Sequence, residues 1–134
     1  MAIQYSLTHR TNAMSQLNTD IGINAVIKIF SGAAPANCGT ADTGSLLVQF
    51  AGNATAFGAV ASQVLTANAV ASVAAAATGT AGYFRIYPSA ATTTNAVTQG
   101  TVAASAADMI VTNVSIAAGQ TCNFTSLTVT AFGV

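Results

Sequence analysis

The chemistry open to this chain is limited by how few charged side chains it carries. Charged residues make up 4% of its 134 residues, whereas a soluble domain usually carries about a quarter. Three cations cannot build the basic face that nucleic-acid phosphates require, so we expect no nucleic-acid partner. A surface made mainly of Ser, Thr, Asn, Gln and Ala lacks charge repulsion and favours association. The charged residues are Arg10, Lys28, Arg85, Asp20, Asp42 and Asp108, and His9 is the only histidine.

The segment "ADTGSLL", which contains Asp42, includes the core of the aspartic-protease motif. That chemistry needs two carboxylates that share one proton, which a dimer of one chain can supply. The motif normally follows an apolar strand, but here it follows "NCGT", and no later partner segment of the usual type is present. Asp-Thr-Gly is also ordinary in turns, where the aspartate bonds its own backbone and the glycine adopts positive φ. We therefore interpret Asp42 as a turn residue.

Other routes to catalysis lack a partner residue. A nucleophilic serine would have only His9 as its base, and the three aspartates lie in separate contexts that form no glycosidase pair. Cys38 and Cys122 are the only possible disulfide, and two cysteines with one histidine and no CxxC give no zinc or iron–sulfur site. In a protein made in a cytoplasm, both thiols are expected to be buried and free. The sequence predicts no catalytic residue, metal or cofactor, and so no enzyme.

The segment "GYFRIYP" places an arginine between aromatic residues and reads as a strand. Because side chains alternate along a strand, Phe84 and Ile86 face one side and belong in the core. Tyr83, Arg85 and Tyr87 face the other side. One interpretation is a solvated face in which Arg85 pairs with an aspartate, Asp108 being a candidate. The other is an interface patch, since tyrosine and arginine are enriched at binding hot spots.

The segment "AVIKIF" repeats this pattern, with Lys28 between Val26 and Phe30 on one face. The candidate interface residues are therefore Tyr83, Arg85, Tyr87 and Lys28.

Two kinds of element are expected to position these residues. A helix over about 9–21 is predicted from an apolar stripe, with Thr8 or Thr11 as its N-cap and Gly22 at its C-terminal end. From about residue 23 onward, short β-branched runs alternate with turn residues. We expect strands within 23–30, 45–50, 54–60, 62–70, 81–87, 96–102, 108–116 and 121–132, with a hairpin loop at 117–120. The stripe consists of Ala13, Met14, Leu17 and Ile21.

These short strands favour an all-β domain, a β-sandwich or barrel, over residues 1–134. The longest weakly interrupted apolar run, "AVASVAAAATGTAG", is mostly alanine and falls short of the ~18 apolar residues of a membrane span. No secretory signal is visible at the N-terminus. We therefore expect a cytoplasmically made protein with no membrane partner.

Three segments resemble capsid decoration, or cement, proteins of tailed bacteriophages. They are "IKIFSGAAPA" (27–36), "GTAGYFRIY" (79–87) and "DMIVTNVSIAAGQTCNFTSLTVTA" (108–131), and the helix "RTNAMSQLNTDIG" ahead of the first also fits. The resemblance implies a β-sandwich of jelly-roll type on the outer surface of an icosahedral head. It also implies a homodimer or homotrimer that bridges major capsid protein subunits and has no active site.

Three hypotheses follow for the function. The first is a structural virion protein that decorates the capsid and is synthesised in the host cytoplasm. The second is a tail or fibre component whose β-sandwich binds a receptor or glycan. The third, and least favoured, is a dimeric protease that uses Asp42.

Overall fold

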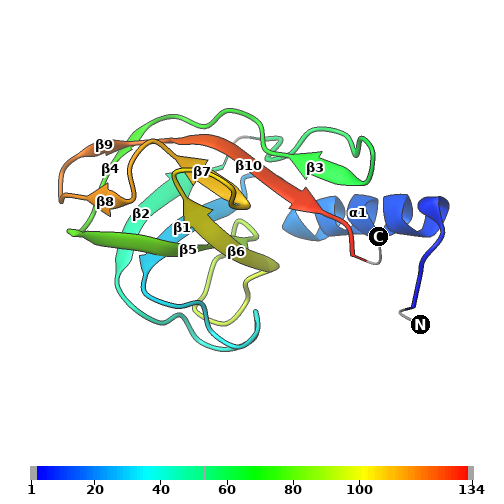
Figure 1. Cartoon of the computed structure of the whole chain (residues 1–134), viewed down its shortest axis with the longest axis horizontal. Coiled ribbons are helices and arrows are strands. Elements are labelled where there is room, and N and C mark those ends of the chain that lie inside the picture. The colour runs from blue at the N-terminus through cyan, green and yellow to red at the C-terminus, as the bar shows by residue number, and fades with distance from the viewer. Residues whose placement is uncertain (1–2, 53, 133–134) are drawn as a thin grey trace.

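A computed structural model describes residues 3–52 and 54–132, and strands predominate among them beside one helix near the N-terminus (Figure 1). The predicted all-β class with a single N-terminal helix is confirmed. The elements in chain order are α1 (Leu7–Ile21), β1 (Val26–Ser31), β2 (Leu46–Ala51), β3 (Val64–Thr66), β4 (Val73–Ala74), β5 (Gly79–Tyr87), β6 (Thr98–Ala103), β7 (Met109–Val111), β8 (Ser115–Ile116), β9 (Thr121–Cys122) and β10 (Phe124–Thr130).

Helix α1 begins at Leu7, ahead of the predicted range 9–21. Its N-cap is Ser6, whose backbone is extended and whose hydroxyl accepts a hydrogen bond from the His9 N–H at 3.1 Å. A serine in this role satisfies one of the free N–H groups of the first turn. The prediction of Thr8 or Thr11 as N-cap is wrong, because both lie within the helix.

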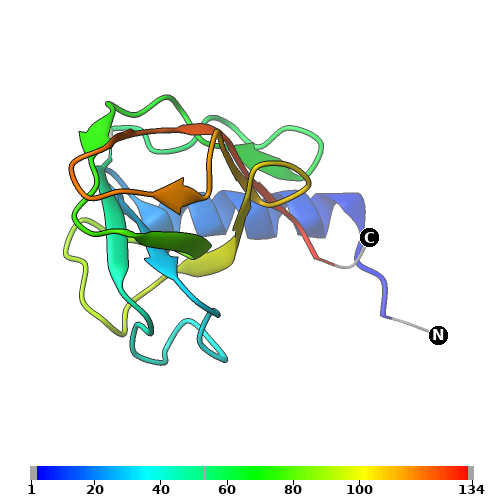
Figure 2. The same cartoon turned by 60° about the vertical axis from the view of Figure 1, so that its left-hand side comes forward.

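The C-terminal end of α1 agrees with the sequence. Gly22 has a φ of 70° and donates its N–H to the Asn18 carbonyl at 3.1 Å, as expected for a glycine that ends a helix. Met14 and Ile21 are buried, and Leu17 packs partly against the core. Figures 1 and 2 show the C-terminal part of α1 against the sheet and its N-terminal part projecting beyond it.

The main sheet curls into a half-barrel (Figures 1 and 2). Its strands run in the order β2-β1-β5-β6-β7-β10-β3, β8 joins β5, and β4 and β9 form a separate two-stranded sheet. Strands β6 and β7 pair in parallel, whereas the other named pairs are antiparallel. The fold is β-rich and resembles a β-sandwich, as predicted. The finer expectation of a jelly-roll topology stays a prediction.

Several predicted strands are shorter than expected, and of segment 62–70 only Val64–Thr66 forms a strand. The segment 23–30 enters β1 only at Val26, because Asn24 has a positive φ of 53° and belongs to the preceding turn. The segment 54–60 contributes an isolated bridge between Phe57 and Ala67.

The predicted hairpin around 117–120 differs more. Strands β7 and β10 do pair, with Met109 opposite Leu127 and Val111 opposite Phe124. Between them, however, β8 pairs with β5 and β9 pairs with β4. The two arms of the β7–β10 connection therefore pair with different strands, and not with each other.

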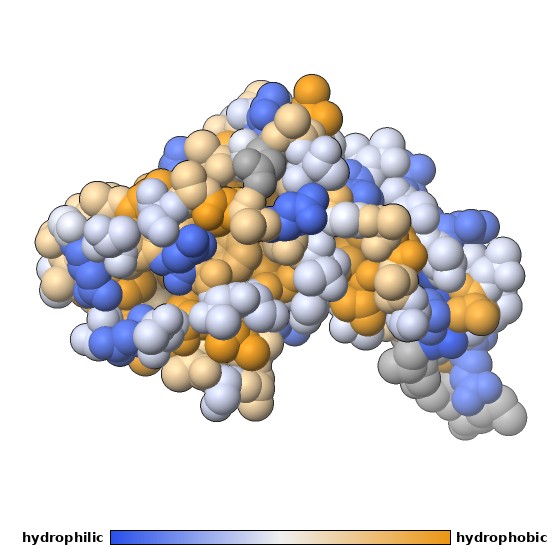
Figure 3. Space-filling model, turned by 90° about the horizontal axis from the view of Figure 1, so that it is seen from above, coloured by the Kyte–Doolittle hydropathy of each residue, from blue (hydrophilic) through white to orange (hydrophobic). Residues whose placement is uncertain are grey.

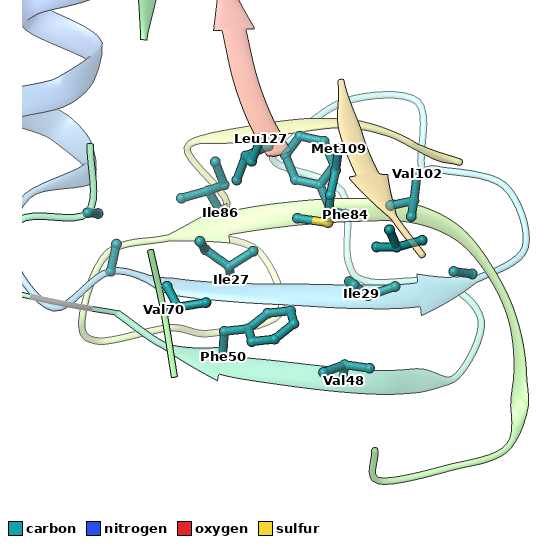
Figure 4. Packing of buried hydrophobic residues seen from close by; sticks show 14 of the residues in the cluster. Ile27, Ile29, Val48, Phe50, Val70, Phe84, Ile86, Val102, Met109 and Leu127 are labelled. Carbon is teal, nitrogen blue, oxygen red and sulfur yellow. The ribbon is translucent and has the colours of Figure 1, made fainter. Parts of the chain in front are cut away.

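The core lies on the concave side of the half-barrel. Ile27 and Ile29 on β1 face the same interior as Phe84 and Ile86 on β5, and Met109 and Leu127 close it from the opposite side (Figure 4). The register sets Ile27 opposite Ile86 and Ile29 opposite Phe84. The prediction that Phe84 and Ile86 belong in the core is confirmed.

We predict that Gly82→Ala destabilises the fold, because a Cβ on Gly82 would lie 1.9 Å from the Gly32 carbonyl oxygen. Forced overpacking of this kind costs about 2–3 kcal/mol, which urea unfolding followed by circular dichroism can measure. Gly58→Ala is the matched control, since its nearest neighbouring atoms would lie at 3.9 Å. Equal stability of the two variants would contradict the close approach.

Candidate functional site

The face of β5 that points away from the core is covered by the chain itself. Tyr83, Arg85 and Tyr87 have exposed fractions of 1%, 0% and 0%. The expectation that they form an outward contact surface is therefore wrong. The alternative of a solvated face is wrong as well, because segment 32–45, which joins β1 to β2, lies over these side chains and bonds to them.

Arg85 is held by a complete set of acceptors. Its Nε and Nη2 donate to Gln99 Oε1 at 3.0 and 2.9 Å, and Nη2 also donates to the Asn37 carbonyl at 2.9 Å. Its Nη1 donates to the Thr40 carbonyl and to Asp42 Oδ1, each at 2.8 Å. A guanidinium has five N–H donors, and these contacts occupy all of them. Buried charge is tolerated when it is paired and fully hydrogen-bonded in this way.

Two neighbouring side chains fasten the same segment. The Gln99 Nε2 donates to the Pro35 carbonyl at 2.8 Å, which fixes the amide that Arg85 uses. The Tyr83 hydroxyl donates to the Thr43 carbonyl at 2.6 Å and accepts from the Thr43 N–H at 3.0 Å. We call Tyr83, Arg85, Tyr87, Gln99 and Asp42 the loop clamp.

Lys28 is the one predicted interface residue that reaches solvent. It lies directly opposite Arg85 in the β1–β5 register and is half-buried. Its Nζ lies 4.7 Å from the centre of the Tyr87 ring, in a cation–π arrangement. Beside it, the rings of Phe30 and Tyr83 stack with centres 5.1 Å apart. The outer face of β1 and β5 is therefore a small packed layer of its own.

The electrostatics of the clamp reflect its burial. For Arg85, burial by itself lowers the pKa, but the combined polar and charge interactions with Asp42 and Tyr87 outweigh it and raise the pKa overall. For Tyr87, burial raises the phenol pKa far above its ordinary value, and the hydrogen bond to Asp42 raises it further, while Arg85 opposes the rise. Tyr87 is thus kept neutral, and its hydroxyl donates a hydrogen bond to Asp42 Oδ1.

Asp42 has a structural part in this arrangement. Its Oδ1 accepts from both Arg85 Nη1 and the Tyr87 hydroxyl, and its backbone N–H donates to the Thr93 carbonyl at 3.1 Å. The expected bond from its side chain to its own backbone is replaced by these long-range contacts. Gly44 has a φ of 69°, as the turn interpretation predicted. A protease would need this carboxylate free to share a proton with a second one, whereas its Oδ1 here accepts two hydrogen bonds.

Asp108 is not the partner of Arg85 that the sequence suggested. Its Oδ2 accepts from the backbone N–H and the hydroxyl of Thr101, each at 3.0 Å. This carboxylate therefore fastens the β6–β7 connection instead.

Other classes of site find little support within residues 3–52 and 54–132. Cys38 and Cys122 are free, as predicted, but half-buried instead of buried. No three His, Cys, Asp or Glu side chains of the described chain gather as a metal site. Among the residues that the structure describes, no helix has both the length and the apolar character needed to cross a membrane. Comparisons with protein-family models, curated proteins and solved structures found no match.

The described surface combines neutral polar residues with exposed apolar ones. Figure 3 shows apolar side chains between polar ones across the face seen from above. Near the projecting end of α1, the Tyr5 ring stacks on His9 and meets the Phe132 ring edge-on. The large exposed apolar side chains are Ile3, Tyr5, Leu7, Ile23 and Phe132.

We predict that Asp42→Asn lowers the free energy of unfolding by about 3 kcal/mol, because removing one partner leaves a buried charge uncompensated. Chemical unfolding measures the change. Asp20→Asn is the control, since Asp20 is exposed and bonds only Gln16 among the contacts described. A cost for Asp42→Asn no larger than for Asp20→Asn would show that the pair does not hold the segment.

We also predict an alkaline loss of stability that depends on Tyr87. In the unfolded chain this phenol ionises near its ordinary pKa of about 10, whereas the folded state keeps it protonated. The stability that Tyr87 contributes is therefore complete below that pH and falls as pH rises above it. Unfolding free energies measured across this range should fall less steeply for Tyr87→Phe than for the parent. Tyr5→Phe, at an exposed ring outside the loop clamp, is the matched control, and identical slopes in both variants would refute the assignment.

Proposed function

We propose that this chain is a structural virion protein that decorates and cements the outside of an icosahedral bacteriophage head. In this proposal it bridges major capsid protein subunits, associates with itself as a dimer or trimer, and is made in the host cytoplasm. The resemblance of 27–36, 79–87 and 108–131 to capsid decoration proteins supports it. A β-sandwich of jelly-roll type is the finer description of the fold that belongs to this proposal.

The observation that carries the proposal is segment 32–45, which is exposed on one side and clamped on the other. On its buried side, backbone carbonyls of the segment accept hydrogen bonds from Arg85, Gln99 and Tyr83. A segment held in one conformation loses little entropy when it binds a partner. Its exposed residues are small and uncharged: Gly32, Ala33, Ala34, Ala36, Asn37, Gly39, Thr40, Ala41, Thr43, Gly44 and Ser45.

These properties suit docking on a protein shell. Small side chains allow close backbone approach, and neutral hydrogen-bonding groups are not screened by salt as ion pairs are. The segment's one carboxylate, that of Asp42, is already bonded to Arg85 and Tyr87. Arg85 acts in this proposal as the residue that positions the contact surface, not as the contact.

The test is attachment of an Ala34→Arg variant to phage heads assembled without the protein, measured by co-sedimentation. Ala34 is exposed and lies outside the clamp. An arginine buried without a partner at an interface should weaken binding by about tenfold or more. Ala118→Arg is the matched control, because Ala118 is also an exposed alanine but lies on the β8–β9 turn.

Equal binding of both variants and the parent would remove segment 32–45 from the interface. Absence of any binding by the parent protein would overturn the decoration function itself. The number of copies per purified particle distinguishes the decoration hypothesis from the tail or fibre hypothesis. A decoration protein is present in far more copies per particle than a fibre protein.

A further inference from the structure

The connection between β7 and β10, residues 112–123, encloses a pocket. Its outgoing arm is held at β5 through pairing of Ser115 with Thr80, and its returning arm is held at β4 through pairing of Cys122 with Val73. In a simple hairpin these two arms would pair with each other through backbone hydrogen bonds. Because each arm pairs elsewhere, a space of about 280 Å³ remains between them.

The pocket has an apolar floor and a neutral polar wall. Ile29, Val111 and Ile116 line it from the core side and are each at most 5% exposed. None of the described residues that line it is charged or aromatic. Burial also raises the pKa of the Cys122 thiol, which lies in this wall. The polar lining consists of Thr112, Asn113, Gln120, Thr121, Cys122 and Asn123.

Hydrogen bonds to neighbouring segments fix the walls of the pocket. At the tip of the connection, Gly119 donates its N–H to the Ala75 carbonyl at 2.8 Å, and Ala118 donates its N–H to the Thr78 hydroxyl at 3.0 Å. At the base, Asn123 Nδ2 donates to the Val70 carbonyl at 3.2 Å. The walls are tied to segments outside the connection, so the cavity is preformed, as ligand pockets usually are.

We propose that this pocket binds one small uncharged molecule that combines an apolar ring or short chain with a hydroxyl group. An apolar floor favours an apolar body, and side-chain amides and hydroxyls around it can bond a single polar group. A charged ligand would lose its hydration without gaining an opposite charge. A sugar is a poorer fit, since the lining offers no aromatic ring for stacking. This binding does not depend on the proposed role at the capsid.

The experiment uses phenol as the probe and the two natural cysteines as reporters. The intact protein is alkylated with iodoacetamide at increasing phenol concentration, and the modification of each cysteine is followed by mass spectrometry of its peptides. We expect saturable protection of Cys122 in the millimolar range, with unchanged alkylation of Cys38, which lies in segment 32–45. Equal effects on both thiols, or no protection of Cys122, would overturn the proposal.

A blocked variant completes the test. Thr112 lines the pocket but is exposed, so Thr112→Trp can fill the mouth without replacing a core residue. Protection of Cys122 by phenol should be lost in this variant while its circular dichroism matches the parent. Ala104→Trp, at an exposed residue outside the pocket, should keep the protection. Protection that persists in Thr112→Trp would show that phenol acts elsewhere.

Discussion

The buried guanidinium of Arg85 sets the constraint on which the outer half of the structure depends. A permanent charge can be removed from water only if its donors all find acceptors. Here the acceptors come from β6 and from segment 32–45, which are distant in sequence. The segment can therefore take only the path that brings two backbone carbonyls and one carboxylate to the guanidinium. Desolvation offsets much of the attraction in such a pair, so its main effect is to specify one conformation of the segment.

This arrangement gives the sheet two packed sides of different character. The concave side is filled by aliphatic and phenyl side chains, and the convex side of β1 and β5 carries the clamp, the Phe30–Tyr83 stack and Lys28 over Tyr87. Covering the second side adds buried surface to that of the concave core. The proposed docking segment is thus part of the stable fold, and its exposed side is presented in a fixed shape.

The sequence predicted what depends on local pattern and missed what depends on distant partners. The two-residue period of β5 placed Phe84 and Ile86 in the core, and Gly22 marked the end of α1, because both signals are contained within one element. The same period could not tell that Tyr83, Arg85 and Tyr87 would be covered, since their cover is a loop far away along the chain. Asp42, set in that long loop, was the available signal for a partner of Arg85. Nothing in the local sequence indicated that β8 and β9 would not pair with each other, because their partners, β5 and β4, are distant along the chain.

The place of β10 in the sheet also bears on how the protein is synthesised. It is the last strand along the described chain, yet it lies between β7 and β3 in the interior of the strand order. Until the ribosome has released this strand, β7 and β3 have no common neighbour, and both present unpaired backbone edges. The half-barrel can therefore close only after β10 has left the ribosome, and a nascent chain stalled before β10 is an aggregation-prone species.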